Sequence, residues 1–213
     1  MKYNVLTPDQ AATINKLHIG SGKFIVPGWL NIDIYPDASF LDCPVAKSTV
    51  QPLVLNHDIR KTLPELIGKI EFIYSSHFIE HLTLFEGVQF LTDMYSYLQP
   101  GGAFRISCPD IELWMDHYTN NDIGFFQKYY NEYHSWAQVP VLSTKAQIFS
   151  MMLYSWNHHA VYDFETLSLL LHNAGFNTVL RKKAFESTLP NITILEPSEP
   201  GRLLESLYIE AYK

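Results

Sequence analysis

Two glycines and a carboxylate have the types and spacing expected of a ligand site: Gly20 and Gly22 are followed, eleven positions after Gly22, by Asp33. The glycines end a short apolar stretch, residues 16–19, and Asp33 lies near the end of a second, residues 30–34, and we predict both stretches to be strands. A glycine turn lets the backbone approach a ligand closely, because no Cβ intervenes. A carboxylate at the end of the next parallel strand can accept hydrogen bonds from a ribose diol. The pattern therefore predicts a site for a cofactor that carries a nucleoside.

The residues between these two strands decide which cofactor is expected. A dinucleotide site needs a third glycine, a helix and an acid about 20 residues on, whereas here the third glycine position is Ile25 and Pro27-Gly28 interrupts any helix. The crossover from Gly20 to Trp29 is only ten residues long. Without a helix to hold a pyrophosphate, a ligand with adenosine but no phosphate fits better than NAD. We predict S-adenosylmethionine as cofactor and S-adenosylhomocysteine as product, with a purely structural glycine turn as the alternative.

Composition places the chain among ordinary globular proteins. Its 213 residues are 47% hydrophobic and 17% charged, enough for one domain with a sizeable core. The net charge is −7 and the longest basic cluster is Arg181-Lys182-Lys183, which argues against nucleic acid as a partner, since neutralising phosphates needs a basic face. Nucleic acid is therefore not expected as the main partner.

The compartment is predicted from cysteine usage and hydropathy. Cys43 and Cys108 are the two cysteines, too few for a disulfide framework, so reduced thiols are expected. The first residues lack the apolar stretch of a signal peptide, and no run approaches the roughly 18 apolar residues of a membrane span. We expect a cytoplasmic protein without a membrane partner.

Strands and helices alternate along the chain. We predict further strands over residues 53–58, 70–75, 103–108, 178–185 and 206–211. Thr83 and Glu86 form a capping box for a helix over 85–98, with Val88 and Leu91 on its apolar face, and Asp163 and Gly175 bound a helix over 163–174. This order predicts an α/β fold, a Rossmann-like doubly wound seven-stranded sheet. It should be mostly parallel with an antiparallel last strand, because a proline-rich loop rather than a helix precedes that strand.

An aromatic-rich segment separates the fifth and sixth predicted strands. Residues 109–160 are mostly helical by pattern and crowded with Trp, Tyr and Phe. We take residues 1–213 as one domain, with 109–160 as a helical insertion or lid. Most of its rings are expected to pack the insertion onto the sheet, and some to line an acceptor site, because Trp and Tyr offer apolar faces with a polar tip.

Several short motifs, in this order, resemble those of class I S-adenosylmethionine-dependent methyltransferases. The similarity is greatest to the small-molecule branch, which is methyltransferase type 11-like. The matching pieces are residues 17–22, 31–33, 57–59, 74–82, 98–102 and Phe176. The resemblance spans nearly the whole chain, and it implies methyl transfer to a small molecule, with a sugar or glycan precursor as the candidate class of acceptor.

The resemblance also implies which residues bind the cofactor. These are His18, Gly20, Ser21, Gly22, Asp33, Ile34, Asp58, Ile59, Ser75 and Ser76. Asp33 would bind the ribose hydroxyls and Asp58 the adenine amino group, with Ser75 and Ser76 beneath the sulfur. His18 departs from the family, which usually has an acid or Asn there, and a histidine cannot neutralise the cofactor's amino group as an anion.

Methyl transfer needs alignment more than a catalytic triad, so the candidates for catalysis are few. His77 and His81 follow the strand over 70–75, at the sheet edge where α/β proteins bind ligands, and imidazole suits proton removal near neutral pH. Residues expected to bind the acceptor are Asp110, His158, His159 and Tyr162. No metal is expected in this interpretation.

Two alternatives remain open at this level. His77-Phe78-Ile79-Glu80-His81 matches the H-x-x-E-H arrangement of inverted zincin peptidases, in which two histidines on one helical face bind zinc. A zinc hydrolase of this kind would need a third ligand, such as Glu112 or His158. The other alternative is a non-catalytic binding module that keeps the methyltransferase fold.

Overall fold

A computed structural model describes residues 2–3, 6–34, 53–137, 144–196 and 198–213. Cys43 lies outside these residues. Cys108 is buried with a free thiol. Of the helices in these ranges, none combines the length and apolarity that a membrane span requires.

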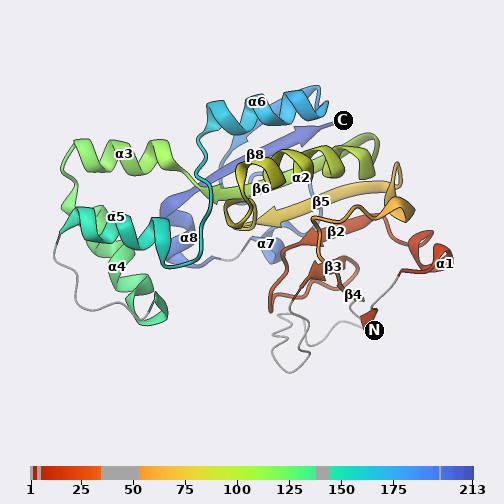
Figure 1. Ribbon diagram of the computed structural model, residues 1–213, viewed down its shortest axis with the longest axis horizontal. Coiled ribbons are helices and arrows are strands. Elements are labelled where there is room, and N and C mark those ends of the chain that lie inside the picture. Colours follow the sequence, from red (N-terminus) through yellow and green to blue (C-terminus); the bar gives the residue numbers. More distant parts are fainter. Residues whose placement is uncertain (1, 4–5, 35–52, 138–143, 197) are drawn as a thin grey trace.

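An eight-stranded sheet forms the centre of the molecule, in the order β1-β4-β3-β2-β5-β6-β8-β7 (Figure 1). The strands are β1 (Lys2–Tyr3), β2 (Lys16–Ile19), β3 (Leu30–Asp33), β4 (Leu53–Asn56), β5 (Ile70–Ser76), β6 (Leu98–Pro109), β7 (Thr178–Lys182) and β8 (Ser206–Tyr212). Strands β1 to β6 pair in parallel, and β8 lies antiparallel between β6 and β7. The predicted doubly wound sheet of seven strands with an antiparallel last strand is confirmed, and β1 is an additional edge strand of two residues.

Several predicted boundaries were wrong. Strand β4 ends at Asn56 rather than Asp58, because Asp58 turns to hydrogen-bond Arg60. Strand β7 ends at Lys182 rather than Phe185, because the chain there leaves the sheet edge and folds over its face. The segment predicted as a long loop before β8 contains two short helices, α7 (Ile192–Leu195) and α8 (Pro200–Glu205).

One face of the sheet is covered by α2 (Leu84–Tyr97) and α6 (Phe164–Ala174), which lie side by side (Figure 1). The capping box of Thr83 and Glu86 is present, and so are the Asp163 N-cap and the left-handed Gly175. The predicted apolar face of α2 was partly wrong. Val88 is 46% exposed, whereas the helix turns Phe90, Leu91, Met94 and Tyr97 into the core. The short α1 (Pro8–Ala11) and η2 (Pro64–Leu66) complete this side.

Polar side chains are buried on the opposite face. Arg105 is 0% exposed, and its guanidinium forms an ion pair with Glu196 at 2.7 Å. It also donates to the backbone oxygens of Lys183 and Glu186 at 2.8 and 3.2 Å. These bonds hold the segment that follows β7 against the sheet, and α7 adds Leu195 to a small apolar cluster there.

Three helices lie between β6 and α6, at one end of the sheet (Figure 1): α3 (Ile111–Thr119), α4 (Ile123–Ala137) and α5 (Lys145–Tyr154). They enclose a second hydrophobic cluster around Trp114, which is 0% exposed and contacts the rings of Phe125, Phe126 and Tyr129. Helix α8 packs against α4. Strand β5 points toward this end, so the carboxyl ends of the parallel strands face the helices.

We expect Glu196→Gln to lower the free energy of unfolding by about 3–5 kcal/mol, because it leaves a fully buried guanidinium without its counter-charge. Chemical denaturation measures this change. The matched control is Glu186→Gln, which removes the exposed partner of Lys182 and should cost less than about 1 kcal/mol. Equal, small effects of the two substitutions would contradict the importance of the buried pair.

Candidate functional site

A cavity of about 680 Å³ opens at the carboxyl ends of β2, β3, β4 and β5. It is lined by Gly20, Ile32, Asp33, Ile34, His57, Asp58, Ile59, Arg60, His77, Phe78, His81, Leu82, Thr83, Glu86, Trp156, Asn157 and His159. We call it the first cavity. It brings together many of the predicted cofactor residues, which are spread over forty positions of sequence from Gly20 to Ile59.

The glycine turn and Asp33 form one unit. The Gly20 and Ser21 N–H groups donate to the Ile32 oxygen at 3.0 and 3.2 Å, and the Gly22 N–H donates to Asp33 Oδ2 at 2.8 Å. Gly20 has φ +66°, and a Cβ there would lie 2.7 Å from the Phe78 ring, so glycine is required at this position. The carboxylate is therefore fixed at the cavity edge by the same turn that the sequence pattern predicts.

Asp58 lies on a different wall of the first cavity. Both of its carboxylate oxygens bind Arg60, at 2.8 and 2.9 Å, and Arg60 also contacts Glu86 at 3.2 Å. The hydrogen bond from Arg60 lowers the pKa of Asp58 below its ordinary value. Asp58 thus remains ionised near neutral pH, with lone pairs still available to a donor on a ligand.

Five predicted cofactor residues do not line either cavity described in this section: Gly22, whose N–H binds Asp33, and four residues with polar side chains. His18 is buried, its Nδ1 lies 3.0 Å from Asn31 Oδ1, and burial lowers its pKa to about 4, so it is neutral at pH 7. Ser21 and Ser75 are also buried, and Ser76 accepts a hydrogen bond from a serine on β6. The geometry gives these four side chains structural surroundings, and their cofactor roles stay predictions.

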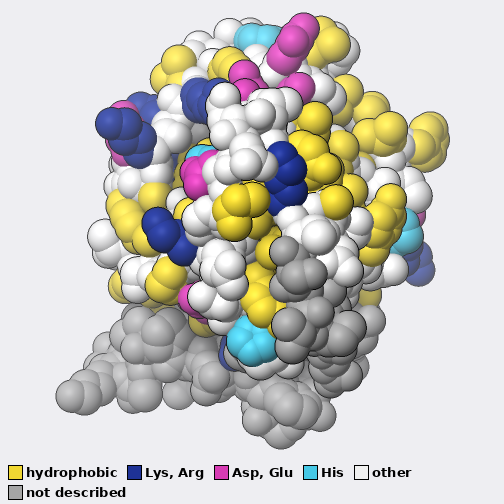
Figure 2. Space-filling view, turned by 90° about the vertical axis from the view of Figure 1, so that its left-hand side faces the viewer, with side chains coloured by type: hydrophobic (Ala, Val, Ile, Leu, Met, Phe, Trp, Pro, Cys, Tyr) yellow, Lys and Arg dark blue, Asp and Glu magenta, His cyan; other side chains and the backbone are white. Residues whose placement is uncertain are grey.

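A second cavity of about 390 Å³ adjoins the first. It is lined by Lys23, Phe24, His77, Glu80, His81, Tyr129, Glu132, Tyr133, Trp156, His158, Glu199, Arg202 and Glu205. His77, His81 and Trp156 line both cavities and so lie where they meet. Figure 2 views the molecule from the end formed by α3, α4 and α5, and on this face acidic, basic and hydrophobic side chains are interspersed.

His77 is held tightly at this junction. Its backbone φ is +47°, which is rare for a residue with a Cβ. Nδ1 lies 3.3 Å from Glu80 Oε1, and Nε2 lies 2.6 Å from Ser206 Oγ. Burial lowers the pKa of His77 to about 4, so the ring is neutral; Nδ1–H then faces the carboxylate and the Ser206 hydroxyl donates to Nε2. With both nitrogens engaged, His77 is poorly placed to accept a further proton.

Two buried carboxyl groups in the second cavity have pKa values that are shifted in opposite directions. Burial alone would raise the pKa of Glu80, but His77, His81 and His158 together outweigh it and hold the pKa below its ordinary value. Burial raises the pKa of Glu205 to about 8, and repulsion from Glu80 adds to this effect. The cavity therefore holds one carboxylate and one carboxylic acid near neutral pH.

The predicted acceptor residues divide into two groups. His158 lines the second cavity and His159 the first. Asp110 caps the start of α3 and binds Arg181, and Tyr162 is 1% exposed in the main core. The two histidines thus line the cavities, whereas Asp110 and Tyr162 line neither of them, and acceptor binding by all four residues stays a prediction.

Sequence reasoning missed several residues that line the second cavity. Arg202 and Glu205 lie on α8, inside the segment predicted as a loop, and Tyr129 and Tyr133 come from α4. The sequence predicts that some rings of the 109–160 insertion line an acceptor site, but it does not single out these tyrosines or Trp156. No local signal marks α8, because its place in the site depends on its packing against α4.

The zinc-peptidase alternative depended on a helix that is not present. Residues Ile79–His81 form the 3₁₀ helix η3, and His77 precedes it in the left-handed region. His77 and His81 therefore do not lie on one face of an α-helix. Of the two third ligands suggested from sequence, Glu112 is exposed and binds Arg181, whereas His158 lies close to Glu80 and His81.

Comparison with known proteins gives structural but not sequence relatives. No family model matches the chain, and no curated protein sequence matches it. A crystal structure of an S-adenosylmethionine-dependent methyltransferase from Archaeoglobus fulgidus matches with 17% identity and a TM-score of 0.52, over 95% of this chain and 87% of that one. A Thermotoga maritima methyltransferase, described as a possible histamine N-methyltransferase, matches with 18% identity and a TM-score of 0.51, over 93% and 81%.

A third similar structure contains bound ligands. It is phosphoethanolamine N-methyltransferase 2 from Haemonchus contortus, in complex with phosphomonomethylethanolamine and S-adenosylhomocysteine. The identity is 12% and the TM-score 0.54, over 95% of this chain but 49% of that one, so the chain spans about half the length of this relative. At these identities the comparisons show the fold, which is that of the class I S-adenosylmethionine-dependent methyltransferases.

Because Glu205 keeps its proton in the folded protein, we expect the free energy of unfolding to decrease as pH rises. The unfolded carboxyl ionises near 4.5, whereas the folded one keeps its proton to about pH 8, so the free energy of unfolding decreases as pH rises across this range. Glu205→Gln should remove a few kcal/mol of this decrease between pH 5 and 8, as followed by chemical denaturation. The exposed Glu165→Gln on α6 is the control and should keep the wild-type slope. An unchanged slope in Glu205→Gln would show that the carboxyl is ionised in the folded protein.

Proposed function

We propose that this protein transfers a methyl group from S-adenosylmethionine to a small-molecule acceptor and releases S-adenosylhomocysteine. The observation that carries the proposal is the first cavity, in which Gly20, Asp33 and Asp58 meet at the carboxyl edge of a class I methyltransferase sheet. A second cavity for the acceptor adjoins it through His77, His81 and Trp156.

The residues of the first cavity fit the cofactor's chemistry. Its volume of about 680 Å³ lies within the range of sites for ligands of this size. Asp33 offers an acidic group for a ribose diol at the glycine turn, and Ile32 and Ile59 offer apolar contact for an adenine ring. Arg60, the one arginine or lysine among these lining residues, is already paired with Asp58 and Glu86, so the cavity lacks a free cation for a pyrophosphate. These features favour S-adenosylmethionine over a dinucleotide.

Bound S-adenosylmethionine supplies a methyl group already activated on a sulfonium. The chain's task is then to align an acceptor atom with that methyl and to exclude water. Trp156, His77 and His81 occupy the junction where the two ligands would meet. Of the two histidines proposed for catalysis, His81 is the better placed to contact the acceptor, because both nitrogens of His77 are engaged.

The walls of the second cavity support an acceptor with both apolar faces and polar groups. Tyr129, Tyr133 and Trp156 come from the 109–160 segment, which we propose as an insertion that forms one wall. Aromatic rings of this kind stack on the faces of sugar rings, and the carboxylates of Glu132 and Glu199 can accept hydrogen bonds from hydroxyls. A sugar or glycan precursor remains the class of acceptor that we propose.

We expect Asp33→Ala to weaken binding of S-adenosylhomocysteine by about 10–100-fold, because hydrogen bonds from the ribose hydroxyls to a charged group are lost. Asp33→Asn keeps one acceptor for the Gly22 N–H and should fall between the alanine variant and the wild type. Isothermal titration calorimetry measures both. The control is the exposed Asp116→Ala on α3, which should bind as the wild type does.

The wild-type titration separates the enzyme from the non-catalytic module. An enzyme that turns over should bind S-adenosylmethionine and S-adenosylhomocysteine with similar dissociation constants, in the micromolar range typical of enzymes. If neither compound binds, the result would contradict methyl transfer and favour the binding module. Equal affinities of the wild type and Asp33→Ala would show that the carboxylate is misassigned.

A further inference from the structure

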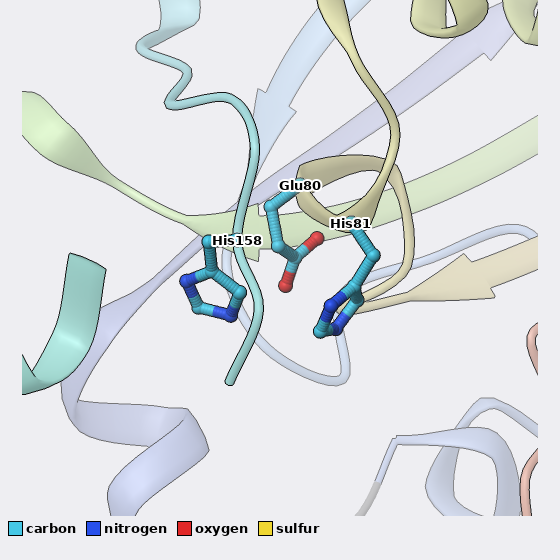
Figure 3. Close-up of side chains that lie close together, drawn as sticks. All are labelled: Glu80, His81 and His158. Carbon is cyan, nitrogen blue, oxygen red and sulfur yellow. The ribbon is translucent and has the colours of Figure 1, made fainter. Parts of the chain in front are cut away.

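Glu80, His81 and His158 form a compact group of metal-ligating side chains. One donor atom from each lies within 4.8 Å of the others. Figure 3 shows the Glu80 carboxylate between the two imidazole rings, with Glu80 and His81 on η3 and His158 on the segment before α6. Nothing in the methyl-transfer proposal requires these three side chains to converge.

The Glu80 carboxylate is buried without sufficient partners. It is 1% exposed, and within the described residues neither of its oxygens has a hydrogen-bond partner of good geometry. His77 Nδ1 lies 3.3 Å from Oε1, but the contact does not satisfy the geometry of a hydrogen bond. Burying a carboxylate costs several kcal/mol unless a cation or several hydrogen bonds compensate it. The carboxylate is therefore a second and independent indication of a positive ligand.

The backbone holds the three side chains in place. The Glu80 oxygen accepts from the His159 and Ala160 N–H groups, at 2.7 and 3.2 Å, and so ties η3 to the segment that carries His158. The ring centroids of His81 and His158 are 5.0 Å apart.

We propose that Glu80, His81 and His158 bind one divalent transition-metal ion, with Zn²⁺ as the best match. Two imidazoles and one carboxylate form the protein ligand set of many zinc sites, whereas Mg²⁺ and Ca²⁺ prefer oxygen ligands alone. In a tetrahedral site, zinc bonds of about 2.0–2.2 Å place two donors about 3.3–3.6 Å apart. The three donor atoms lie within 4.8 Å of one another, and rotation of the two partly buried histidines brings them to this spacing.

This site differs from the zinc-peptidase arrangement expected from the H-x-x-E-H motif. His77 is not a ligand in it, because its Nδ1 faces Glu80 and its Nε2 binds Ser206. His77 instead orients the carboxylate, as outer hydrogen-bond partners do in metal sites. Glu80 binds the ion directly and does not act as a base.

The position of the site gives the ion a role in acceptor binding, and this step rests on the proposed function. Glu80 and His158 line the second cavity, and His81 lines both. A fourth coordination position then faces the second cavity, where an oxygen or nitrogen of the acceptor can bind. His81 would be a metal ligand in this arrangement rather than a free base.

Metal titration of the whole protein tests the site directly. The protein is stripped with a chelator, dialysed and titrated with Co²⁺ followed by visible absorption, and with Zn²⁺ followed by calorimetry. We expect one ion per chain, intense Co²⁺ bands typical of a four- or five-coordinate site, and displacement of Co²⁺ by Zn²⁺. Absence of these bands together with absence of stoichiometric Zn²⁺ binding would overturn the proposal.

Two variants test the proposed ligands, and a third serves as the control. Glu80→Gln and His158→Gln should each weaken Zn²⁺ binding by more than about 100-fold, since removing even an outer hydrogen-bond partner of a ligand costs about 10–100-fold. The matched control is His117→Gln, which disrupts a histidine–carboxylate pair on the surface, 2.9 Å from Asp122, and should leave Zn²⁺ affinity unchanged. Circular dichroism confirms that each variant is folded. Because Glu80 is buried, His158→Gln keeps the test valid if Glu80→Gln fails to fold.

A loss of affinity in His117→Gln, or unchanged affinity in His158→Gln, would place the ion elsewhere and overturn the assignment. Titration with S-adenosylhomocysteine in parallel separates this inference from the proposed function. Zn²⁺ binding without S-adenosylhomocysteine binding would leave the metal site standing and refute methyl transfer. S-adenosylhomocysteine binding without Zn²⁺ binding would refute the metal site and leave the proposed methyl transfer standing.

Discussion

One buried carboxylate, Glu80, determines how the two cavities meet. Its backbone oxygen holds the segment 158–160 by two hydrogen bonds, so that His158 and His159 stand beside the end of β5. Its side chain contacts His77, which in turn binds Ser206 at the start of β8. Three segments that are distant in sequence are thereby joined through Glu80 and its neighbour His77, and both cavities share the walls that result.

The two faces of the sheet differ in polarity, and this difference positions the junction. On the face covered by α2 and α6 the strands bury aliphatic and aromatic side chains, as expected of a doubly wound sheet. The opposite face buries His18, Asn31, Arg105 and Glu210 and pairs them with each other or with the segment after β7. Buried polar groups are stable only when partnered, so this segment is fixed in place, and the chain that follows it leads into α8 and the second cavity.

Much of the fold and the first cavity could be predicted from sequence, because the signals are local. Strand β2, the glycine turn and Asp33 lie within eighteen residues of one another, and the capping residues Thr83 and Asp163 act within one helical turn. The second cavity could not be predicted in this way. Arg202 and Glu205 reach it only through the packing of α8 on α4. The burial of Tyr162 and the pairing of Asp110 with Arg181 depend on the tertiary structure in the same way. His18 illustrates the same limit, since its partner Asn31 lies on the neighbouring strand.

A crystal structure grown with S-adenosylhomocysteine would show whether the first cavity holds the methyl donor. We expect the ribose hydroxyls on the Asp33 carboxylate, the adenine between Ile32 and Ile59, and the sulfur directed toward His81 and the second cavity. A first cavity closed by side chains, or a nucleoside bound away from Asp33, would contradict the assignment of this edge of the sheet as the methyl-donor site.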